Sequence, residues 1–228
     1  MTDILLAWSG GKDAAWTLHT LRQRGDVRVL GLLTTVTAGF DRIAMHGIRR
    51  DVLHAQADAV GLPLIESTIP QGCDNATYEA SFAAALADAR KRWPGLDTIA
   101  FGDLYLADVR AWREALCARH GWENQTPLFG SDTAALAREM IAGGLRTHLC
   151  CVDTEQLDAG FGGRQFDAAL LAELPPGCDP CGENGEFHTL VHAGPMFQRP
   201  MAVERGETGL RDGRFAVTDF TLAPVGRR

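Results

Sequence analysis

Hydrophobic residues in the first half of the chain fall into blocks that predict alternating strands and helices. Residues 4–7 and 27–35 are short apolar runs of the kind found in buried parallel strands. Residues 48–60 instead place apolar side chains near helical spacing, and Gly61 is expected to end that helix. The same patterns predict further strands at residues 64–69 and 98–101 and further helices at residues 15–24, 78–93 and 107–120.

This alternation predicts an α/β fold with a doubly wound parallel sheet, because short connections between such elements require right-handed crossovers. Asn75 is expected to cap the helix that follows it, and residues 37–47 lack periodicity and are expected to form a loop. Ligands bind these sheets beside the carboxyl ends of the strands. We therefore expect three segments that follow strand ends to converge: Ser9–Asp13, the loop with Met45, His46 and Gly47, and Gly102–Asp103.

The pattern changes after Pro127. A helix is predicted up to Ala142, capped within residues 131–133. The remaining elements are a strand at residues 147–152, a short helix at 166–174, and β-structure at 187–192, 201–205 and 215–222, with a hairpin turn at Asp212-Gly213. We therefore expect two domains, residues 1–127 and a smaller α+β domain at residues 128–228.

The segment Ser9-Gly10-Gly11-Lys12-Asp13 links the first strand to the first helix. Two adjacent glycines allow a sharp turn that directs several N–H groups at one point, and the helix adds its positive end. With the charge of Lys12, the turn predicts an anion site; the alternative is an ordinary turn with a solvated lysine. The spacing excludes a Walker loop, and Gly160–Gly163 lacks the last glycine of a dinucleotide fingerprint.

A second group of chemically active residues lies at residues 181–189. It combines two glutamates, a histidine, a threonine and two glycines, which is poor material for a core. Glu186 and His188 alternate as on one face of a strand, so a carboxylate and an imidazole there suit proton transfer or the binding of magnesium and an amine. The alternative is a solvated hairpin with a structural histidine.

The composition is that of a globular protein, with 228 residues, 46% hydrophobic and 22% charged. A net charge of −7 argues against a broad nucleic-acid interface, which needs a basic face. No apolar run approaches the ~20 residues that cross a bilayer, and the first strand begins too early for a signal peptide. We therefore expect a cytoplasmic protein that binds neither nucleic acid nor membrane.

The cysteines are expected to be reduced thiols rather than a disulfide framework. Cys178 and Cys181 form a single CxxC pair, but a structural zinc site needs a second pair, and Cys150 and Cys151 are adjacent. Metal or redox chemistry at these thiols is therefore the less favoured interpretation.

Ser9–Asp13 resembles the SGGKD(S/T) loop of the PP-loop ATP pyrophosphatases, with Ala14 in place of the usual hydroxyl residue. Residues 181–189, followed by Gly194-Pro195-Met196-Phe197, resemble the CGExGE(Y/F)HT signature of the diphthine–ammonia ligase family, a branch of that superfamily. The likeness covers nearly the whole chain. Further matches are Met45-His46, Gly102-Asp103, Arg110, Arg113 and Pro127-Leu128.

The resemblance implies an ATP-dependent ligase. An oxygen of the acceptor attacks the α-phosphate of ATP and releases pyrophosphate, and ammonia then displaces AMP to form an amide. ATP and Mg²⁺ are the implied cofactors, and the partners are a small-molecule or protein acceptor plus ammonia, with a homodimer as a candidate assembly. Residue types do not define the acceptor.

The resemblance also assigns roles to individual residues. ATP binding falls to Ser9, Gly10, Gly11, Lys12, Asp13, Met45, His46, Gly102 and Asp103. The catalytic candidates are Lys12, Asp13, Glu183, Glu186 and His188. Substrate binding falls to Arg110, Arg113, Cys181, Gly182, Glu183, Asn184, Gly185, Glu186 and Thr189, and Mg²⁺ binding to Asp13 and Asp103.

Simpler roles remain open for several of these residues. His46 can be a structural loop histidine, Asp103 a helix cap, and Arg110 and Arg113 part of a solvated helix face. Two other functions also remain open. A nucleotide-binding regulator without turnover is favoured by Ala14, and sulfur or tRNA modification would use Cys178 and Cys181.

Overall fold

A computed structural model describes residues 1–43 and 46–224, and these divide into two compact units. We call Met1–Ser9, Asp13–Ala44 and Leu62–Ser131 the N-terminal unit. The C-terminal unit consists of Gly10–Lys12, Met45–Gly61 and Asp132–Arg228. Each unit is discontinuous in sequence, and the C-terminal unit includes two segments that precede residue 127.

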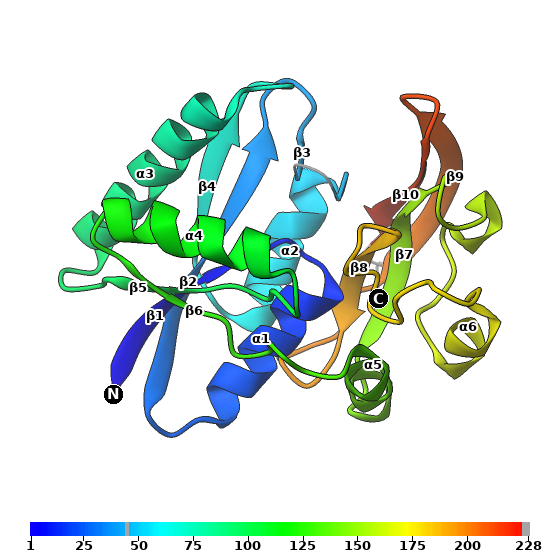
Figure 1. The fold of residues 1–228 in the computed structure, drawn as a ribbon, viewed down its shortest axis with the longest axis horizontal. Helices are drawn as coiled ribbons and strands as arrows, with labels where there is room; N and C mark the ends of the chain where they lie inside the picture. Colours follow the sequence, from blue (N-terminus) through cyan, green and yellow to red (C-terminus); the bar gives the residue numbers. More distant parts are fainter. Residues whose placement is uncertain (44–45, 225–228) are drawn as a thin grey trace. The chain divides into compact units, whose positions relative to one another are not determined.

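The N-terminal unit is built on a mostly parallel sheet (Figure 1). Its parallel strands lie in the order β4, β2, β1, β5, β6, and β3 pairs antiparallel with the end of β2. The order reverses between β1 and β5, which is where doubly wound sheets bind ligands. The strands are β1 (Thr2–Ala7), β2 (Val27–Thr37), β3 (Arg42–Ile43), β4 (Leu64–Ile69), β5 (Thr98–Ala100) and β6 (Glu123–Gln125). This arrangement confirms the predicted doubly wound fold.

The helices of this unit are α1 (Lys12–Gln23), α3 (Asn75–Arg92) and α4 (Ala107–Arg119). Leu5, Phe82 and Ile99 belong to the core, where strand and helix residues pack together at 0–2% exposure. The predicted cap of α3 is wrong by one residue. Asp74, not Asn75, accepts a hydrogen bond from the Thr77 N–H, because its extended backbone aims the carboxylate at the first turn.

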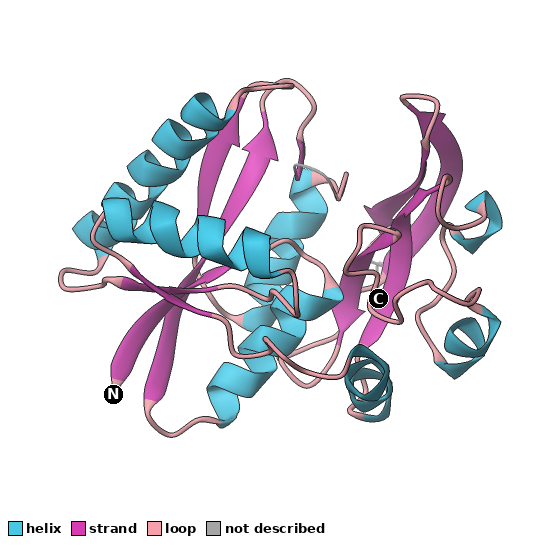
Figure 2. Ribbon diagram, viewed as in Figure 1, coloured by secondary structure: helices cyan, strands magenta, loops and turns pink. Residues whose placement is uncertain are grey.

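The C-terminal unit is built on an antiparallel sheet in the order β8, β7, β10, β9 (Figure 2). The strands are β7 (Arg146–Asp153), β8 (Phe187–Ala193), β9 (Val203–Arg211) and β10 (Phe215–Leu222). The helices are α2 (Arg50–Val60), α5 (Thr133–Ala142), α6 (Ala168–Glu173) and the 3₁₀ turn η1 (Ala159–Phe161). The predicted hairpin turn is confirmed, since Asp212 and Gly213 have φ of 53° and 67°.

Helix α2 belongs to this unit by its contacts. At its start, the Arg49 guanidinium lies 2.6 Å from the Asp219 carboxylate of β10. At its end, Gly61 closes the helix as predicted and adopts the left-handed conformation, and the Gln198 N–H donates to the Ala59 carbonyl. These contacts fix α2 at both ends, which places one buried face of the helix beside residues 10–12 (see below).

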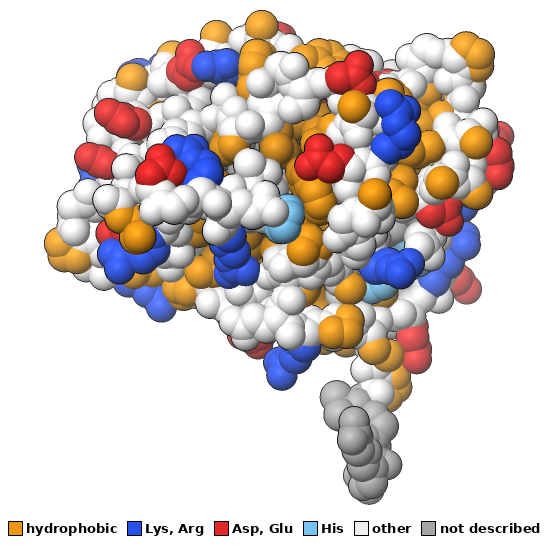
Figure 3. Space-filling model, turned by 90° about the horizontal axis from the view of Figure 1, so that it is seen from below, with side chains coloured by type: hydrophobic (Ala, Val, Ile, Leu, Met, Phe, Trp, Pro, Cys, Tyr) orange, Lys and Arg blue, Asp and Glu red, His pale blue; other side chains and the backbone are white. Residues whose placement is uncertain are grey.

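On the face shown in Figure 3, acidic and basic side chains are interspersed in small groups.

Of the helices within residues 1–43 and 46–224, none is long and apolar enough to cross a membrane.

Candidate functional site

The glycine turn is held by strand β8. The Gly10 carbonyl accepts hydrogen bonds from the Val191 N–H and the Gln56 side-chain amide, both at 3.0 Å. Two residues on, the Lys12 N–H donates to the Thr189 hydroxyl at 2.9 Å. Gly10 has φ of 78°, a conformation that strongly favours glycine. Residues 10–12 are therefore fixed by backbone and side-chain contacts within the C-terminal unit.

The side chain of Lys12 is buried, with 2% exposure. Its ammonium lies 5.6 Å from the centre of the Phe187 ring and 6.0 Å from that of Phe166, within the range of cation–π attraction. A lysine in such apolar surroundings is weakly hydrated, so its charge acts more strongly on a nearby anion than it would at the surface.

Two histidines lie next to the glycine turn. The rings of His46 and His188 are 4.4 Å apart, and a Cβ atom at Gly11 would come within 3.3 Å of His46 Nε2. The structure thus places His46 beside the glycine turn, as expected for these two segments, and it also brings His188 next to His46, a contact that the sequence did not predict. Burial lowers the pKa of His188 to about 4, and the positive charge of Lys12 contributes in the same direction. At neutral pH His188 is therefore an uncharged imidazole that can accept a proton or a hydrogen bond.

The titration of His188 tests this electrostatic account. We expect its imidazole to titrate near pH 4 in the free protein, as followed by the ring proton shifts in NMR spectra. Because the unfolded chain would bind this proton near pH 6.5, His188 should make the folded state less stable as the pH falls from about 6.5 to 4. A His188→Gln variant should lose that part of the pH dependence, and a midpoint near 6.5 in the native protein would contradict the proposed environment.

The segment at residues 181–189 is organised around two carboxylates. Asp179 accepts hydrogen bonds from the Cys181 and Glu183 N–H groups at 2.8 and 3.2 Å, and from the Thr133 hydroxyl at 2.6 Å. Glu186 is 2% exposed, and its Oε1 accepts from the Asp179 N–H at 2.8 Å and from the Asn184 amide at 3.1 Å. Within the described residues, its buried Oε2 has no hydrogen-bond partner. Such an oxygen is costly to bury unless a ligand or solvent satisfies it.

The other predicted residues of this segment differ in exposure. Cys181 is 1% exposed and its thiol lies 3.4 Å from the Thr133 carbonyl, so it serves packing. Gly182 has φ of 68°, and a Cβ there would lie 2.8 Å from the Phe187 carbonyl. Asn184 is exposed, and Glu183 and Gly185 are partly exposed. His188 is also partly exposed, so the surface of this segment that a substrate could reach consists of Glu183, Asn184, Gly185 and His188.

A separate group lies at the strand ends of the N-terminal unit. A Cβ at Gly102 would come within 2.9 Å of the Asp13 backbone, so the segments after β1 and β5 converge as expected. Asp103 accepts from Arg113 at 2.8 Å through Oδ1, and in the described part of the chain its buried Oδ2 has no partner. Burial raises the pKa of Asp103, and the charge of Asp13 contributes while that of Arg113 opposes.

Arg110 and Arg113 are both engaged within the N-terminal unit. Arg113 pairs with Asp103 and its guanidinium lies 4.5 Å from the centre of the Phe101 ring. Arg110 pairs with Glu114 one turn along α4, and lies 4.5 Å from the centre of the Phe129 ring. These contacts place the arginines in packing and ion-pair roles, and a substrate contact stays a prediction.

Some predictions find no structural counterpart. Met45 lies outside the described residues, so its place near adenine stays a prediction. No group of three or more His, Cys, Asp or Glu side chains suited to a metal ion occurs among the residues that the structure describes. Burial raises the pKa of Cys178 to about 11, so its thiol is protonated at neutral pH, which disfavours sulfur chemistry there.

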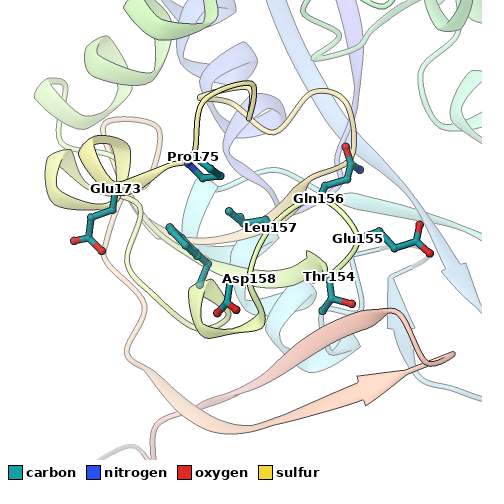
Figure 4. A pocket seen from close by; sticks show the side chains of 8 residues that line it. Thr154, Glu155, Gln156, Leu157, Asp158, Glu173 and Pro175 are labelled. Atoms are coloured by element: carbon teal, nitrogen blue, oxygen red, sulfur yellow. The ribbon is translucent and has the colours of Figure 1, made fainter.

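An open cavity of 460 Å³ lies apart from the predicted site residues, within the C-terminal unit (Figure 4). Its lining consists of Thr154, Glu155, Gln156, Leu157, Asp158, Phe161, Glu173 and Pro175. The carboxylates have structural partners: Glu155 pairs with Arg214, Glu173 with Arg164, and Asp158 caps η1. The cavity is therefore lined by three acidic side chains, each of which has a partner within the protein.

Gln56 is the residue that sequence analysis did not assign to the site. Its spacing from the apolar residues of the helix places Gln56 on the same face of α2. In the structure Gln56 is fully buried, and its side-chain amide donates hydrogen bonds to the carbonyls of Gly10 and Val191. Gln56 could have been recognised in the sequence as a polar residue on an otherwise apolar helix face, because a buried amide needs hydrogen-bond partners.

Comparison with known proteins identifies the family. A family profile described as the diphthamide synthase N-terminal domain matches residues 2–124, and one described as the diphthamide synthase C-terminal domain matches residues 132–216. The chain belongs to the diphthamide synthase family. In this family member, the N-terminal profile contains Gly10–Lys12 in sequence, whereas their contacts belong to the C-terminal unit.

Curated relatives of this diphthamide synthase family member carry the name diphthine–ammonia ligase. The protein of Danio rerio is 27% identical over 236 residues, which cover 96% of this chain and 90% of that protein. The protein of Schizosaccharomyces pombe is 27% identical over 207 residues, or 84% of this chain. That match covers only 34% of the yeast protein, so the chain spans about a third of that relative.

A solved structure also matches part of the fold. It is described as the crystal structure of a predicted subunit of tRNA methyltransferase from Methanocaldococcus jannaschii. The match has a TM-score of 0.43 and 16% identity, and it covers 65% of this chain and 78% of that one.

Proposed function

We propose that this chain is an ATP-dependent ligase of the diphthine–ammonia ligase type. It would adenylate an acceptor oxygen with release of pyrophosphate, and ammonia would then displace AMP to form an amide. The main support is the hydrogen bond from the Lys12 N–H to the Thr189 hydroxyl. It joins the glycine turn, the predicted phosphate site, to the 181–189 segment within one compact unit. Both segments resemble those of ligases in the same family.

In this proposal, residues 9–13 bind the phosphates that depart as pyrophosphate. Backbone N–H groups and the weakly hydrated ammonium of Lys12 would stabilise the negative charge that develops on the leaving group. His46 would lie next to the nucleotide. His188, uncharged at neutral pH, would offer one ring nitrogen as a hydrogen-bond acceptor and the other as an N–H donor, and it would not supply a positive charge.

Asp13 and Asp103 fit a role in holding Mg²⁺. The buried Oδ2 of Asp103 has no partner among the residues described, and the charge of Asp13 acts on the same carboxylate. Two carboxylates are a typical protein contribution for this ion, because phosphate and water oxygens complete its shell. When bound, Mg²⁺ would neutralise phosphate charge.

The acceptor side of the reaction falls to the 181–189 segment. Glu183 and Asn184 are accessible, and Glu186 offers an unsatisfied carboxylate oxygen. Oxygen atoms of this kind suit an ammonium ion or an amine. The relatives are named for diphthine, so a protein that carries that residue is the first acceptor to test, and a small-molecule acceptor is the second.

The experiment is product analysis after incubation with ATP, Mg²⁺, ammonium and either a diphthine-bearing protein or a desalted cell extract. We expect AMP and pyrophosphate in equal amounts, formed only when an acceptor is present. ATP binding without any AMP or pyrophosphate would instead favour a nucleotide-binding regulator, the alternative that Ala14 in place of the usual hydroxyl residue favours. Formation of ADP and phosphate would contradict both proposals.

A further inference from the structure

The orientation of the first peptide in the glycine turn is set by residues outside it. The Gly10 carbonyl points at two donors, the Val191 N–H and the Gln56 amide. In a planar trans peptide the carbonyl and the following N–H point in opposite directions. Because no described peptide is cis, the Gly11 N–H is directed away from Val191 and Gln56.

The side-chain amide of Gln56 is used in its contacts with the glycine turn and β8. It is fully buried, and its Nε2 donates to Gly10 O at 3.0 Å and to Val191 O at 2.7 Å. These two bonds occupy both amide hydrogens of the side chain. Gln56 thus clamps the glycine turn to β8, and a Cβ at Gly10 would come within 2.7 Å of Gln56 Oε1.

The clamp matters because the turn is made of glycines. A Gly-Gly peptide can rotate at little steric cost, and its rotation would exchange the directions of the carbonyl and the N–H group. A carbonyl oxygen pointed at a phosphate would repel it, whereas an N–H group attracts it. A residue that fixes the direction of this peptide therefore controls anion binding without contacting the anion.

Thr189 holds the next peptide by its other group: here the N–H, and not the carbonyl, is bonded to β8, so Thr189 fixes the position of the turn on that strand and does not free a donor for the anion. Its Oγ1 accepts from the Lys12 N–H, and it is 2% exposed. As an acceptor of that bond, the hydroxyl keeps its own hydrogen for another partner. The strand that carries the 181–189 signature thus also shapes the turn at residues 10–12.

We propose that Gln56 and Thr189 are positioning residues for pyrophosphate, which hold the Gly10–Lys12 backbone in its anion-binding conformation. This inference rests on the proposed function, since it assumes that the turn binds the phosphates of ATP. Neither side chain needs to touch the nucleotide. Their loss should therefore weaken the binding of pyrophosphate and leave that of AMP nearly unchanged.

The test is calorimetric titration of four purified variants with Mg²⁺-pyrophosphate and, separately, with AMP. Gln56→Met keeps the length of the side chain and removes the donor, and Thr189→Val keeps its shape and removes the hydroxyl. Each should weaken pyrophosphate binding by about tenfold or more and AMP binding by less than about twofold. Thr189→Ser restores the hydroxyl and should bind pyrophosphate like the wild type.

Thr147→Val is the matched control. Thr147 is fully buried and its hydroxyl donates to the Leu190 carbonyl of β8 at 2.7 Å, so the variant loses a bond to the same strand but none to the turn. It should bind pyrophosphate within about twofold of the wild type, even if its Tm falls. If Gln56→Met does not fold, Thr189→Val and Thr189→Ser carry the comparison with this control.

The outcomes separate the two proposals. Wild-type affinity in both Gln56→Met and Thr189→Val would overturn the positioning role. A loss of equal size in Thr147→Val would overturn it too, because the effect would then be one of general destabilisation. If the wild-type protein binds neither pyrophosphate nor ATP, the proposed function itself fails, and the positioning role fails with it.

Discussion

Replacement of Lys12 by alanine is expected to reduce ATP turnover by about 10²- to 10³-fold, the loss seen when one preorganised charge contact to a transition state is removed. Lys12 is 2% exposed and lies against two aromatic rings, so few water molecules are available to replace its charge. The loss should appear in kcat as well as in KM, because negative charge grows on the leaving pyrophosphate. Steady-state assays of AMP formation measure both constants.

Lys91→Ala is the control for this prediction. Lys91 has 78% of its side chain exposed and pairs with Asp88 on the surface of α3, so its removal should leave turnover unchanged. Unchanged turnover in Lys12→Ala would show that the turn does not bind the reacting phosphates. Loss of the folded state in Lys12→Ala, detected by circular dichroism, would shift the test to Lys12→Met, which keeps most of the apolar contact.

Replacement of Glu186 by glutamine is expected to reduce amide formation by about 100-fold while ATP affinity stays within about threefold. The substitution is nearly isosteric. The amide oxygen of glutamine can still accept from the Asp179 N–H and the Asn184 amide, so the segment should keep its shape. What changes is Oε2, the buried oxygen for which the described residues offer no partner, and which becomes an NH₂ group.

Binding and turnover must be measured separately for Glu186→Gln. Loss of ATP binding would place Glu186 in the nucleotide site rather than on the acceptor side. Full product formation would remove it from the reaction altogether. Glu155→Gln is the matched control, because Glu155 has 65% of its side chain exposed and pairs with Arg214, and it should behave like the wild type.

The fold was largely predictable, because its strands are apolar and its turns carry strong signals. The bounds of β4 and the Asp212-Gly213 turn follow directly from local patterns. Strand β6 was missed because its sequence, Glu123–Gln125, has no apolar residue and depends on pairing with β5. The strand β3 was missed for a different reason: it has only two residues, and it lies in a segment without periodicity.

The candidate site was predictable as residue types but not as contacts. Both signature segments were found, yet the bonds of Gly10 to Val191 and Gln56 join residues far apart in sequence, which local patterns cannot show. Sequence alone also gave His188 no pKa, because the shift depends on burial and on the distance to Lys12. Arg110 and Arg113 had no predicted partners, and the structure supplies Glu114 and Asp103.

The central claim is that ATP is cut at its α-phosphate to form an adenylated acceptor before ammonia acts. The most direct measurement is the exchange of labelled pyrophosphate into ATP, with Mg²⁺ and acceptor present and ammonia absent. We expect label in ATP that depends on the acceptor and disappears in Lys12→Ala. ATP that stays unlabelled while an amide forms on later addition of ammonia would contradict a reversible adenylation step, and exchange of labelled phosphate instead of pyrophosphate would contradict cleavage at the α-phosphate.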